Sequence, residues 1–305
     1  MSEITSEASR QMEESSVPVA MYKTIVVGYD GSEYSKAALT EAAIRVKKTG
    51  GKLILVHAVY FDDEEFGIAP VQLEKRLEVG QKICYQTKEK FASAYGIEIE
   101  SLVCEGEPPE VLVDIAQGKG ADLIALGTHG RKGLKRLLLG SVTSGVIHKS
   151  QCDVLVIKKR CTDCTGSFKS ILVAYDGSAS SRKCLARSIS LARSEGAELT
   201  ALYVIPRYEE MVEFFMTESI RKSLNEEGRK VLSTANEIAS KEGFPLATMV
   251  QEGQSAAKVI EMAGKLKSDL IAMGSHGWTG VNKAIIGSTA ERVIINAACP
   301  VLIVR

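Results

Sequence analysis

The two halves of this chain repeat one another, and this duplication limits the possible folds more than any other feature. The segment TIVVGYDGS at residues 24–32 matches SILVAYDGS at residues 170–178, and GTHG at residues 127–130 matches GSHG at residues 274–277. The matching segments lie 146 and 147 positions apart, as 170 against 24 and 274 against 127 show. A repeat this long, drifting by one position, indicates two copies of one globular domain rather than a solenoid of short repeats.

The domain boundaries follow from the repeat. A chain of 305 residues is long enough for two domains of about 150 residues each. We expect the first domain at residues 21–158, a linker at 159–167 without apolar periodicity, and the second domain at 168–305. Residues 1–20 are rich in Ser and Glu and hold no apolar stretch, which predicts a disordered N-terminal arm rather than a signal peptide.

Within each half, short apolar runs alternate with longer segments of mixed character. The runs predict strands at residues 25–29, 53–59, 97–103, 123–126 and 154–157, and again at 171–175, 199–204, 246–250, 270–273 and 301–304. Helices are expected between them, in the first half at 35–48, 71–94, 109–117 and 142–149. Such alternation predicts an α/β fold with a mostly parallel sheet and helices on both faces. The last strand of each half would lie at a sheet edge, where the two can pair with one another.

Charge and cysteine content narrow the class of protein. Lys plus Arg and Asp plus Glu both number 38, so no net charge points to nucleic acid or to an anionic membrane. The seven cysteines are odd in number and predict free thiols in a reducing compartment, the cytoplasm. Cys161 and Cys164 form one CxxC, which could be half of a zinc site shared across a dimer, a redox pair, or two exposed linker thiols. We favour the linker thiols, because no second CxxC is present.

Unusual residues end the first and fourth predicted strands of each half. The first strand ends in Tyr-Asp-Gly-Ser, with Asp30 in one half and Asp176 in the other, and the fourth ends at Gly127 and Gly274. In an open α/β sheet, ligands bind beyond the carboxyl ends of strands, where the strand order reverses. If the reversal lies between the first and fourth strands, these residues face one crevice.

The fourth strand leads into a spaced glycine motif, G-x-x-G followed after nine residues by G-S, which ends in Gly140-Ser141. The first glycine permits either a left-handed turn or a ligand against bare backbone, and the second can expose N–H groups to an anion. The last pair would open a helix whose N-terminus favours phosphate, with the Ser hydroxyl capping the helix or donating to phosphate. An ordinary surface loop is the alternative, and the second copy of the motif argues against it. Neither a G-K-[ST] ending nor a GxGxxG follows.

These motifs, with the terminal C-P-V-L-I-V strand, resemble the universal stress protein family over nearly all of residues 21–305, once in each half. The resemblance implies two tandem Rossmann-like domains of the adenine nucleotide alpha hydrolase type, with strand order 3-2-1-4-5. It also implies ATP or AMP at the strand carboxyl ends, with Mg²⁺ accompanying ATP. The family pairs domains through their fifth strands, which implies an internal pseudo-dimer here, and a homodimer of chains is possible.

The resemblance also assigns residues. Asp30 and Asp176 would meet the nucleoside, the backbone of Ala58 and Val204 would bind adenine, and the ends of the fourth strands would pack on ribose. The implied binding residues are Asp30, Ala58, Leu126, Gly127, His129, Gly130, Gly140, Ser141 and Val142 in the first half, and Asp176, Val204, Met273, Gly274, His276, Gly277, Gly287, Ser288 and Thr289 in the second.

The four histidines are less specific signals. His129 and His276 lie inside the two glycine loops, where they could contact ribose or phosphate or could pack the loop, and we favour packing. His57 and His148 are interpreted as structural, and no spacing of His, Cys and Asp resembles a metal site.

The two glycine loops differ in charge. The first carries Arg131, Lys132, Lys135 and Arg136, whereas the second has Trp278 and Asn282 at two of these places and keeps one lysine, Lys283. This difference suggests tighter polyphosphate binding in the first domain, unless the basic residues are simply solvated.

The motifs favour a binding protein over an enzyme. Phosphoryl transfer needs a positioned nucleophile, charge neutralisation and usually a base, and the sequence offers a phosphate cradle with few further candidates. Asp30 and Asp176 would sit at the nucleoside end, far from the reacting phosphate. We therefore expect a nucleotide-responsive regulator without catalytic residues. The alternatives are a slow ATPase or phosphotransferase using the same pockets, and a scaffold whose sites have decayed.

Overall fold

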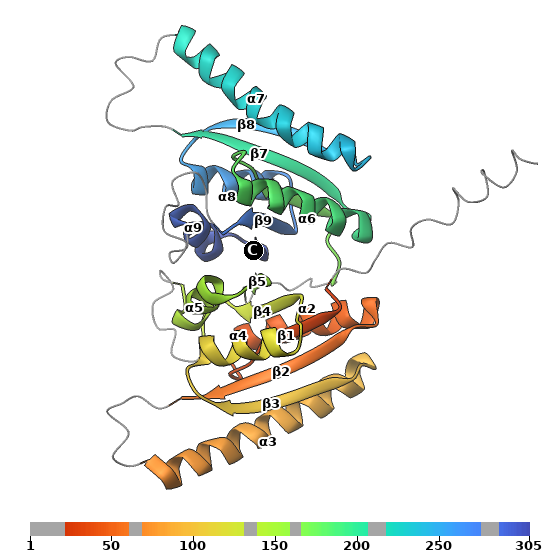
Figure 1. Cartoon of the computed structure of the whole chain (residues 1–305), viewed down its shortest axis with the longest axis vertical. Coiled ribbons are helices and arrows are strands. Elements are labelled where there is room, and N and C mark those ends of the chain that lie inside the picture. Colours follow the sequence, from red (N-terminus) through yellow and green to blue (C-terminus); the bar gives the residue numbers. More distant parts are fainter. Residues whose placement is uncertain (1–21, 61–68, 131–138, 159–165, 207–217, 276–286) are drawn as a thin grey trace, which may run out of the picture.

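The computed structural model describes residues 22–60, 69–130, 139–158, 166–206, 218–275 and 287–305. Strands and helices alternate in both halves (Figure 1). The first domain contains β1 (Thr24–Gly28), α2 (Glu33–Thr49), β2 (Lys52–Val59), α3 (Ala69–Tyr95), β3 (Ile99–Glu105), α4 (Pro108–Gly118), β4 (Leu123–Gly127), α5 (Ser141–Lys149) and β5 (Asp153–Ile157). The second contains β6 (Ser170–Ala174), α6 (Ala179–Glu195), β7 (Glu198–Pro206), α7 (Glu218–Lys241), β8 (Ala247–Gly253), α8 (Ser255–Lys265), β9 (Leu270–Gly274), α9 (Ser288–Asn296) and β10 (Val301–Val304).

The strands form a single sheet in the order β3-β2-β1-β4-β5-β10-β9-β6-β7-β8. All neighbours within a domain are parallel, and each domain has the internal order 3-2-1-4-5. The predicted α/β class with two tandem parallel-sheet domains is therefore confirmed. β5 and β10 pair antiparallel at the centre, with Leu155 opposite Leu302, so the last strand of each domain has a neighbour on both sides.

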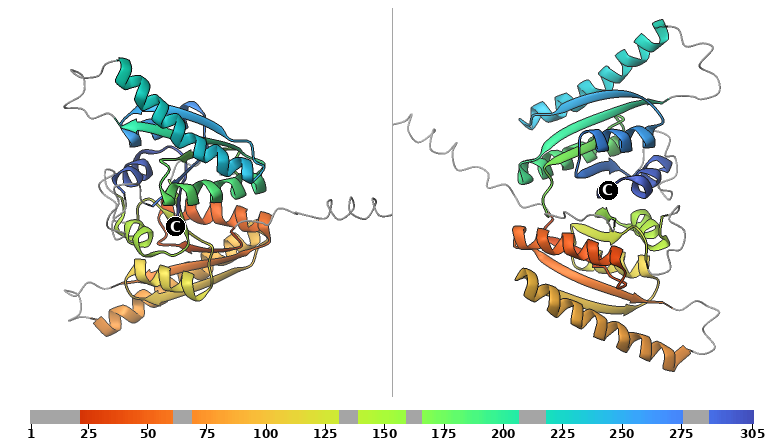
Figure 2. Two further views of the ribbon diagram at one scale, coloured as in Figure 1. Left: turned by 45° about the horizontal axis from the view of Figure 1, so that its top comes forward. Right: turned by 180° about the vertical axis from the view of Figure 1, so that it is seen from behind.

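Helices cover both faces of this sheet (Figures 1 and 2). The side chains of β1 alternate between the two faces: Val27 packs with α2 and α3, whereas Val26 packs with α4 and α5. Burial on both faces explains why the central strands are almost continuously apolar, as in the fully buried DVLVI of β5. α3 and α7 lie at opposite ends of the molecule, whereas α2 and α6 lie near the junction of the domains.

Matching capping contacts begin and end the first helix of each domain. The Ser32 hydroxyl accepts a hydrogen bond from the Ser35 N–H at 3.2 Å, and Gly50 ends α2 with a φ of 64°. In the second domain Ser178 and Gly196 do the same for α6, with a φ of 66° at the glycine. A serine N-cap and a left-handed C-terminal glycine are strong helix boundaries, and α2 agrees closely with the helix predicted at 35–48.

The third strands depart most from the prediction. They start two residues and one residue later than expected, at Ile99 and Ala247, and run on to Glu105 and Gly253. Pairing with β2 sets these limits, because β3 begins opposite Leu53 and follows β2 to Val59. Ile97 is apolar and packs against the core, as a strand residue would, but it does not pair with β2. This explains why the predicted strand began too early.

Each domain supplies a cation to the other domain's last helix. Lys158, which follows β5, donates a hydrogen bond from Nζ to the carbonyl of Ile295 near the end of α9. Arg305, which follows β10, donates from Nη2 to the carbonyl of His148 at 3.0 Å and from Nε to that of Ser150 at 2.8 Å. A cation at a helix C-terminus satisfies unpaired carbonyls and interacts favourably with the helix dipole. We call these contacts the reciprocal caps.

A buried carboxylate marks the same junction. Asp153 accepts a hydrogen bond from the Tyr22 hydroxyl at 2.8 Å and forms an ion pair with Arg187 of the second domain at 3.1 Å. Burial, and then the nearby Asp153 carboxylate, raise the pKa of Tyr22 well above its ordinary value.

None of the helices within the described segments combines the length and the apolar character that crossing a bilayer requires.

Candidate functional site

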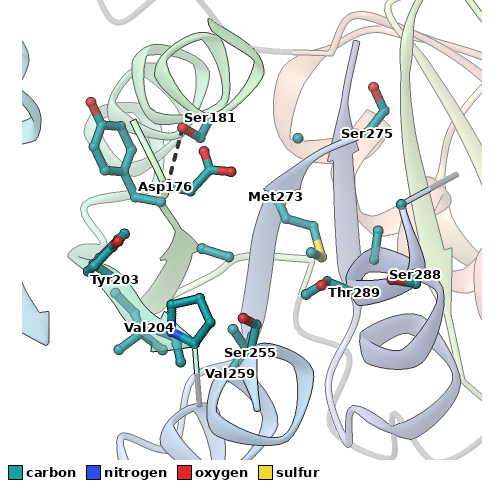
Figure 3. Close-up of a pocket in the computed structure, with 17 residues that line it drawn as sticks. Asp176, Ser181, Tyr203, Val204, Ser255, Val259, Met273, Ser275, Ser288 and Thr289 are labelled. Carbon is teal, nitrogen blue, oxygen red and sulfur yellow. Dashed lines mark hydrogen bonds between the residues drawn. The ribbon is translucent and has the colours of Figure 1, made fainter. Parts of the chain in front are cut away.

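A cavity of about 310 Å³ opens at the carboxyl ends of the strands in the second domain (Figure 3). It lies where β6 and β9 are neighbours and the chain order reverses. Asp176 and Ser181 line one side, Ser288 and Thr289 at the start of α9 line the opposite side, and Met273 lies between them. The strand-end residues therefore face one crevice, as the sequence predicts.

The first domain has a cavity at the equivalent place, between β1 and β4, with a volume of about 120 Å³. It is lined by strand-end residues, by the start of α4, and by α5. The predicted residues among its lining are Asp30, Ala58, Leu126, Gly127, His129, Gly130 and Val142. The two domains thus form the same site at different sizes.

The acidic residue that follows the first strand organises the turn into the next helix. Asp30 Oδ1 accepts a hydrogen bond from the Ser32 N–H at 2.9 Å, and Asp176 Oδ1 accepts from the Ser178 N–H at the same distance. Such side-chain contacts two residues ahead form an Asx turn, which explains why Asp suits this place. A Cβ on Gly130 would lie 2.8 Å from Asp30 Oδ2, so the loop after β4 passes directly over the carboxylate.

The strand-end glycines have a packing role that the sequence does not reveal. Gly127 does not adopt a positive φ, so the left-handed turn considered for it is wrong. A Cβ there would lie 2.6 Å from the backbone carbon of Tyr34 in α2. Gly274 is similarly close to Ser180 of α6, whose backbone carbon would be 3.0 Å away. Glycine therefore lets the first helix approach the fourth strand, and this brings the strand end beside Asp30 or Asp176.

Glycine rather than serine is the N-cap of the helices after the fourth strands. Gly140 is the N-cap of α5 and Gly287 is the N-cap of α9, so of the two roles considered for Ser141 and Ser288, capping the helix is wrong. A glycine N-cap has no side chain to accept from the first N–H groups of the helix, which leaves them available to an anion. Thr143 Oγ1 donates to the Gly127 carbonyl at 2.8 Å and fixes α5 against the end of β4.

Each cavity is lined by seven of the nine residues predicted for its domain. The cavity of the second domain is lined by Asp176, Val204, Met273, Gly274, Gly287, Ser288 and Thr289. In the first domain, Gly140 and Ser141 are not among the described residues that line the cavity, although Val142 of α5 is. His276 and Gly277 lie outside the described residues, as do the basic residues of the first loop and their counterparts in the second, Trp278, Asn282 and Lys283.

Sequence reasoning missed the residue that opens the helix after the third strand. Ser255 begins α8 and lines the second cavity, and Pro108 begins α4 and lines the first. The available signal was the preceding glycine, because Gly106 and Gly253 have φ of 134° and 144° and turn the chain from the strand into the helix.

A second missed position lies on β2 and β7. His57 lines the first cavity and Tyr203 the second. The Nδ1–H of His57 donates to the Tyr29 carbonyl at 2.7 Å, which fixes the ring beside the site, so its structural role and its place in the cavity wall coincide.

His129 also contributes to packing. Its ring lies 5.5 Å from the ring of Tyr34, centroid to centroid, at an angle of 49°. This contact agrees with the favoured packing role, and His129 lines the cavity as well.

Among the residues that the structure describes, no three His, Cys, Asp or Glu side chains are grouped as a metal site would require. The five cysteines in this part of the chain are Cys84, Cys104, Cys152, Cys184 and Cys299, and all are free thiols. Burial raises the pKa of Cys184 to about 12 and that of Cys84 to about 11, so these two behave as apolar core residues. Cys161 and Cys164 lie outside the described segments.

Comparisons with known proteins agree on one family. The universal stress protein family model matches residues 21–158 and again residues 167–305. A universal stress protein of Methanocaldococcus jannaschii is 37% identical over 140 residues, which are 45% of this chain and 82% of that protein. The structure of a universal stress protein from Archaeoglobus fulgidus covers 92% of this chain and 96% of its own, with a TM-score of 0.71 at 22% identity. Another universal stress protein, solved in complex with cAMP, is 29% identical and covers 45% of this chain and 97% of its own, with a TM-score of 0.36.

Proposed function

Because the chain belongs to the universal stress protein family, we propose that it binds adenine nucleotides, ATP or AMP, in one pocket of each domain. Bound nucleotide would alter the shape or partners of the protein, which would then act as a stress-response regulator in the cytoplasm. The observation that carries this proposal is the repeated site, in which an acidic strand end faces an uncapped helix N-terminus across a cavity.

The residues present fit such a ligand. In the second domain, Ser288 and Thr289 bring two hydroxyls to the N-terminus of α9, where N–H groups and the helix dipole favour a phosphate. Asp176 lies across the cavity, where a carboxylate suits ribose hydroxyls, and Val204 offers backbone groups at the end of β7 for a base. Mg²⁺ would accompany ATP and be held mostly by phosphate oxygens.

The position of the aspartates favours binding over turnover. Asp30 and Asp176 each use one oxygen to hold the turn after the first strand. In the proposed binding mode they lie at the nucleoside end, across the cavity from the helix N-terminus that would bind phosphate, and away from the reacting phosphate. A slow ATPase or phosphotransferase is the alternative, and a turnover assay on the purified protein separates the two. Phosphate release well above background, lost in a Ser288 variant, would favour the enzyme.

The junction of the domains supports a further part of the proposal. Antiparallel pairing of β5 with β10, together with the reciprocal caps, would make the chain an internal pseudo-dimer. Association of two such chains into a homodimer is a separate proposal, which sedimentation analysis of the purified protein can test.

The experiment that tests nucleotide binding is gentle purification followed by release and chromatography of bound small molecules, and then calorimetric titration with AMP and ATP. We expect adenine nucleotide in the released material and about two sites per chain at saturation. Ser288→Glu should weaken AMP binding at least tenfold, because its carboxylate occupies the helix N-terminus and repels phosphate.

The matched control is Ser288→Gln, which has nearly the same size without the charge. A glutamate also suits the first turn of a helix, so the charged variant should fold. Equal AMP affinity in the two variants would show that phosphate does not bind at α9, and no binding of AMP or ATP to the native protein would refute the proposed function.

A further inference from the structure

We infer that the second domain is the resting nucleotide site of this chain, and that the first domain admits nucleotide only when its pocket widens. This inference rests on the proposed function. It adds the order in which the two pockets fill and the side chains that set this order. It reverses the order that the basic loop of the first domain suggests.

The two cavities differ in volume. Cavities that hold ligands of this kind in proteins span roughly 300 to 1,000 Å³. The cavity in the second domain, at about 310 Å³, reaches this range, whereas the cavity in the first domain, at about 120 Å³, does not. A nucleotide could enter the first pocket only after side chains move, and that movement costs binding free energy.

The floor of the first pocket explains the difference. A Cβ on Gly28 would lie 2.5 Å from Leu126 Cδ2 and 3.1 Å from Leu112 Cδ1. Glycine at this place therefore lets two leucines, from β4 and α4, converge over the bare backbone of β1. Both leucines line the cavity, so their convergence reduces the space in it.

The second domain has different residues at the same three places. Ala174 stands where the first domain has Gly28, and Val259 and Met273 stand where it has leucines. A methyl group at this place is incompatible with the leucine positions of the first domain, because a Cβ on Gly28 would lie 2.5 Å from Leu126 Cδ2. Val259 is one carbon shorter than leucine, and the unbranched side chain of methionine adapts its shape to a ligand.

The walls differ in polarity as well as in size. At the start of the helix after the third strand, the second domain has Ser255 where the first has Pro108. At the second residue of the following helix, it has Thr289 where the first has Val142. A nucleoside phosphate has hydroxyls and phosphate oxygens that must find partners when they leave water, and two added hydroxyls meet that need. The second pocket therefore suits a polar ligand better.

The test exchanges two of these residues between the domains in the full chain. Ser255→Pro with Val259→Leu gives the second domain the residues that the first has at these two places, and Pro108→Ser with Leu112→Val does the reverse. Each new residue already occupies the equivalent place in the same fold, and proline is favourable as the first residue of a helix, so both variants should fold. Circular dichroism and thermal unfolding verify this before calorimetric titration with AMP.

For the native chain, we expect one AMP site at least tenfold tighter than the other. The exchange in the second domain should weaken the tight site at least tenfold. The exchange in the first domain should leave the tight site unchanged and bring the weak site within about threefold of it. Thr289→Val is a milder variant that should weaken the tight site about threefold, and it keeps the test available if the double exchange does not fold.

The remaining outcomes distinguish a failure of this inference from a failure of the proposed function. Two equal sites in the native chain, or a tight site unaffected by the exchange in the second domain, would overturn this inference while leaving the proposed function intact. A tight site strengthened or lost on changing only Pro108 and Leu112 would place it in the first domain and would also overturn the inference. No binding of AMP, ATP or adenosine to any variant would overturn the proposed function itself.

Discussion

Domain 1 and domain 2 hold the start of the site with matching contacts, yet their cavities have volumes of about 120 and 310 Å³. The same Asx turn, with a distance of 2.9 Å, follows the first strand of each. The same serine cap begins each first helix, at 3.2 Å. Hydrogen bonds to the backbone therefore keep the frame of a duplicated domain constant, while a few apolar side chains behind that frame change what it can hold.

At the junction, too, the two domains share the same backbone arrangement but differ in their side chains. Tyr22, just before β1, donates to Asp153, whereas the places equivalent to these two residues in the second domain are Phe168 and Pro300. Phe168 instead lies under the guanidinium of Arg45, 4.6 Å from its ring centroid. One half therefore contributes a titratable pair to the junction, and the other contributes an aromatic surface.

The strand-end glycines hold the shared frame together, and substituting them should cost the most stability. Gly127→Ala should lower the free energy of unfolding by about 3 kcal/mol, because its Cβ would meet the Tyr34 backbone, which cannot move aside as a side chain can. Gly274→Ala should cost about half as much, since the nearest backbone atom of Ser180 is farther away, at 3.0 Å, and the rest of the obstacle is the serine side chain. Urea unfolding of each variant measures both values, and a greater loss at Gly274 would contradict this account of the frame.

A smaller loss of stability is expected at Gly28, where the two cavities differ. Gly28→Ala should cost about 1–2 kcal/mol, because the new methyl displaces the flexible end of Leu126. Adding Leu126→Met copies the pair found in the second domain and should recover at least half of this loss. Thermal unfolding of the single and double variants provides the comparison. Equal stability of the two variants would mean that the leucine does not close over Gly28.

The two halves of the junction should differ in how their contribution to stability depends on alkaline pH. The folded-state pKa of Tyr22 is raised above the value of about 10 expected in the unfolded chain, so its contribution to stability is complete below pH 10. Above that pH the unfolded chain loses the phenolic proton while the folded chain keeps it. Stability should therefore fall by up to about 1.4 kcal/mol per pH unit, until the folded-state pKa is reached.

Tyr22→Phe, which copies the residue of the second domain, should make this pH dependence shallower. The slope should fall by the equivalent of up to one proton released on unfolding. Urea unfolding at pH 9, 10 and 11 measures the slope for both proteins. Identical slopes would show that Tyr22 titrates in the folded state as it does in the unfolded chain.

The smallest effects concern the reciprocal caps. Arg305→Met should lower the free energy of unfolding by about 1–2 kcal/mol, because it removes two hydrogen bonds to the end of α5. Lys158→Met removes one such bond from the end of α9 and should cost about 0.5–1 kcal/mol. The order of the two losses, measured by urea unfolding, is the informative result, and a costlier change at Lys158 would reverse the comparison.

Much of the fold could be predicted because its signals are local and occur twice. Runs such as the DVLVI of β5 are buried on both faces, and serine and glycine mark the ends of α2 and α6. The third strands were less accurate, since their ends depend on pairing with β2 and β7, which no local pattern records. The reciprocal caps were invisible for the same reason, because they join residues more than 130 positions apart.

The site could be predicted in outline but not in its proportions. Asp30, Gly127 and Gly140 attract attention through their spacing, although the packing of Gly127 against α2 could not be read from that spacing. The difference in volume depends on Leu112 and Leu126 meeting over Gly28, and these residues come from three separate elements. Single residues without a motif, such as Ser255, become visible only when the helices are placed around the cavity.

The reciprocal caps have a consequence for anyone who builds chimeras from proteins of this kind. A half excised from the chain keeps its own fold-defining signals but loses the cation that completes its last helix, because Lys158 and Arg305 each serve the opposite half. Splicing halves from different parents will therefore succeed best when Lys158 and Arg305 are taken as a matched pair. A crossover placed only in the linker separates each of these cations from the helix that it completes.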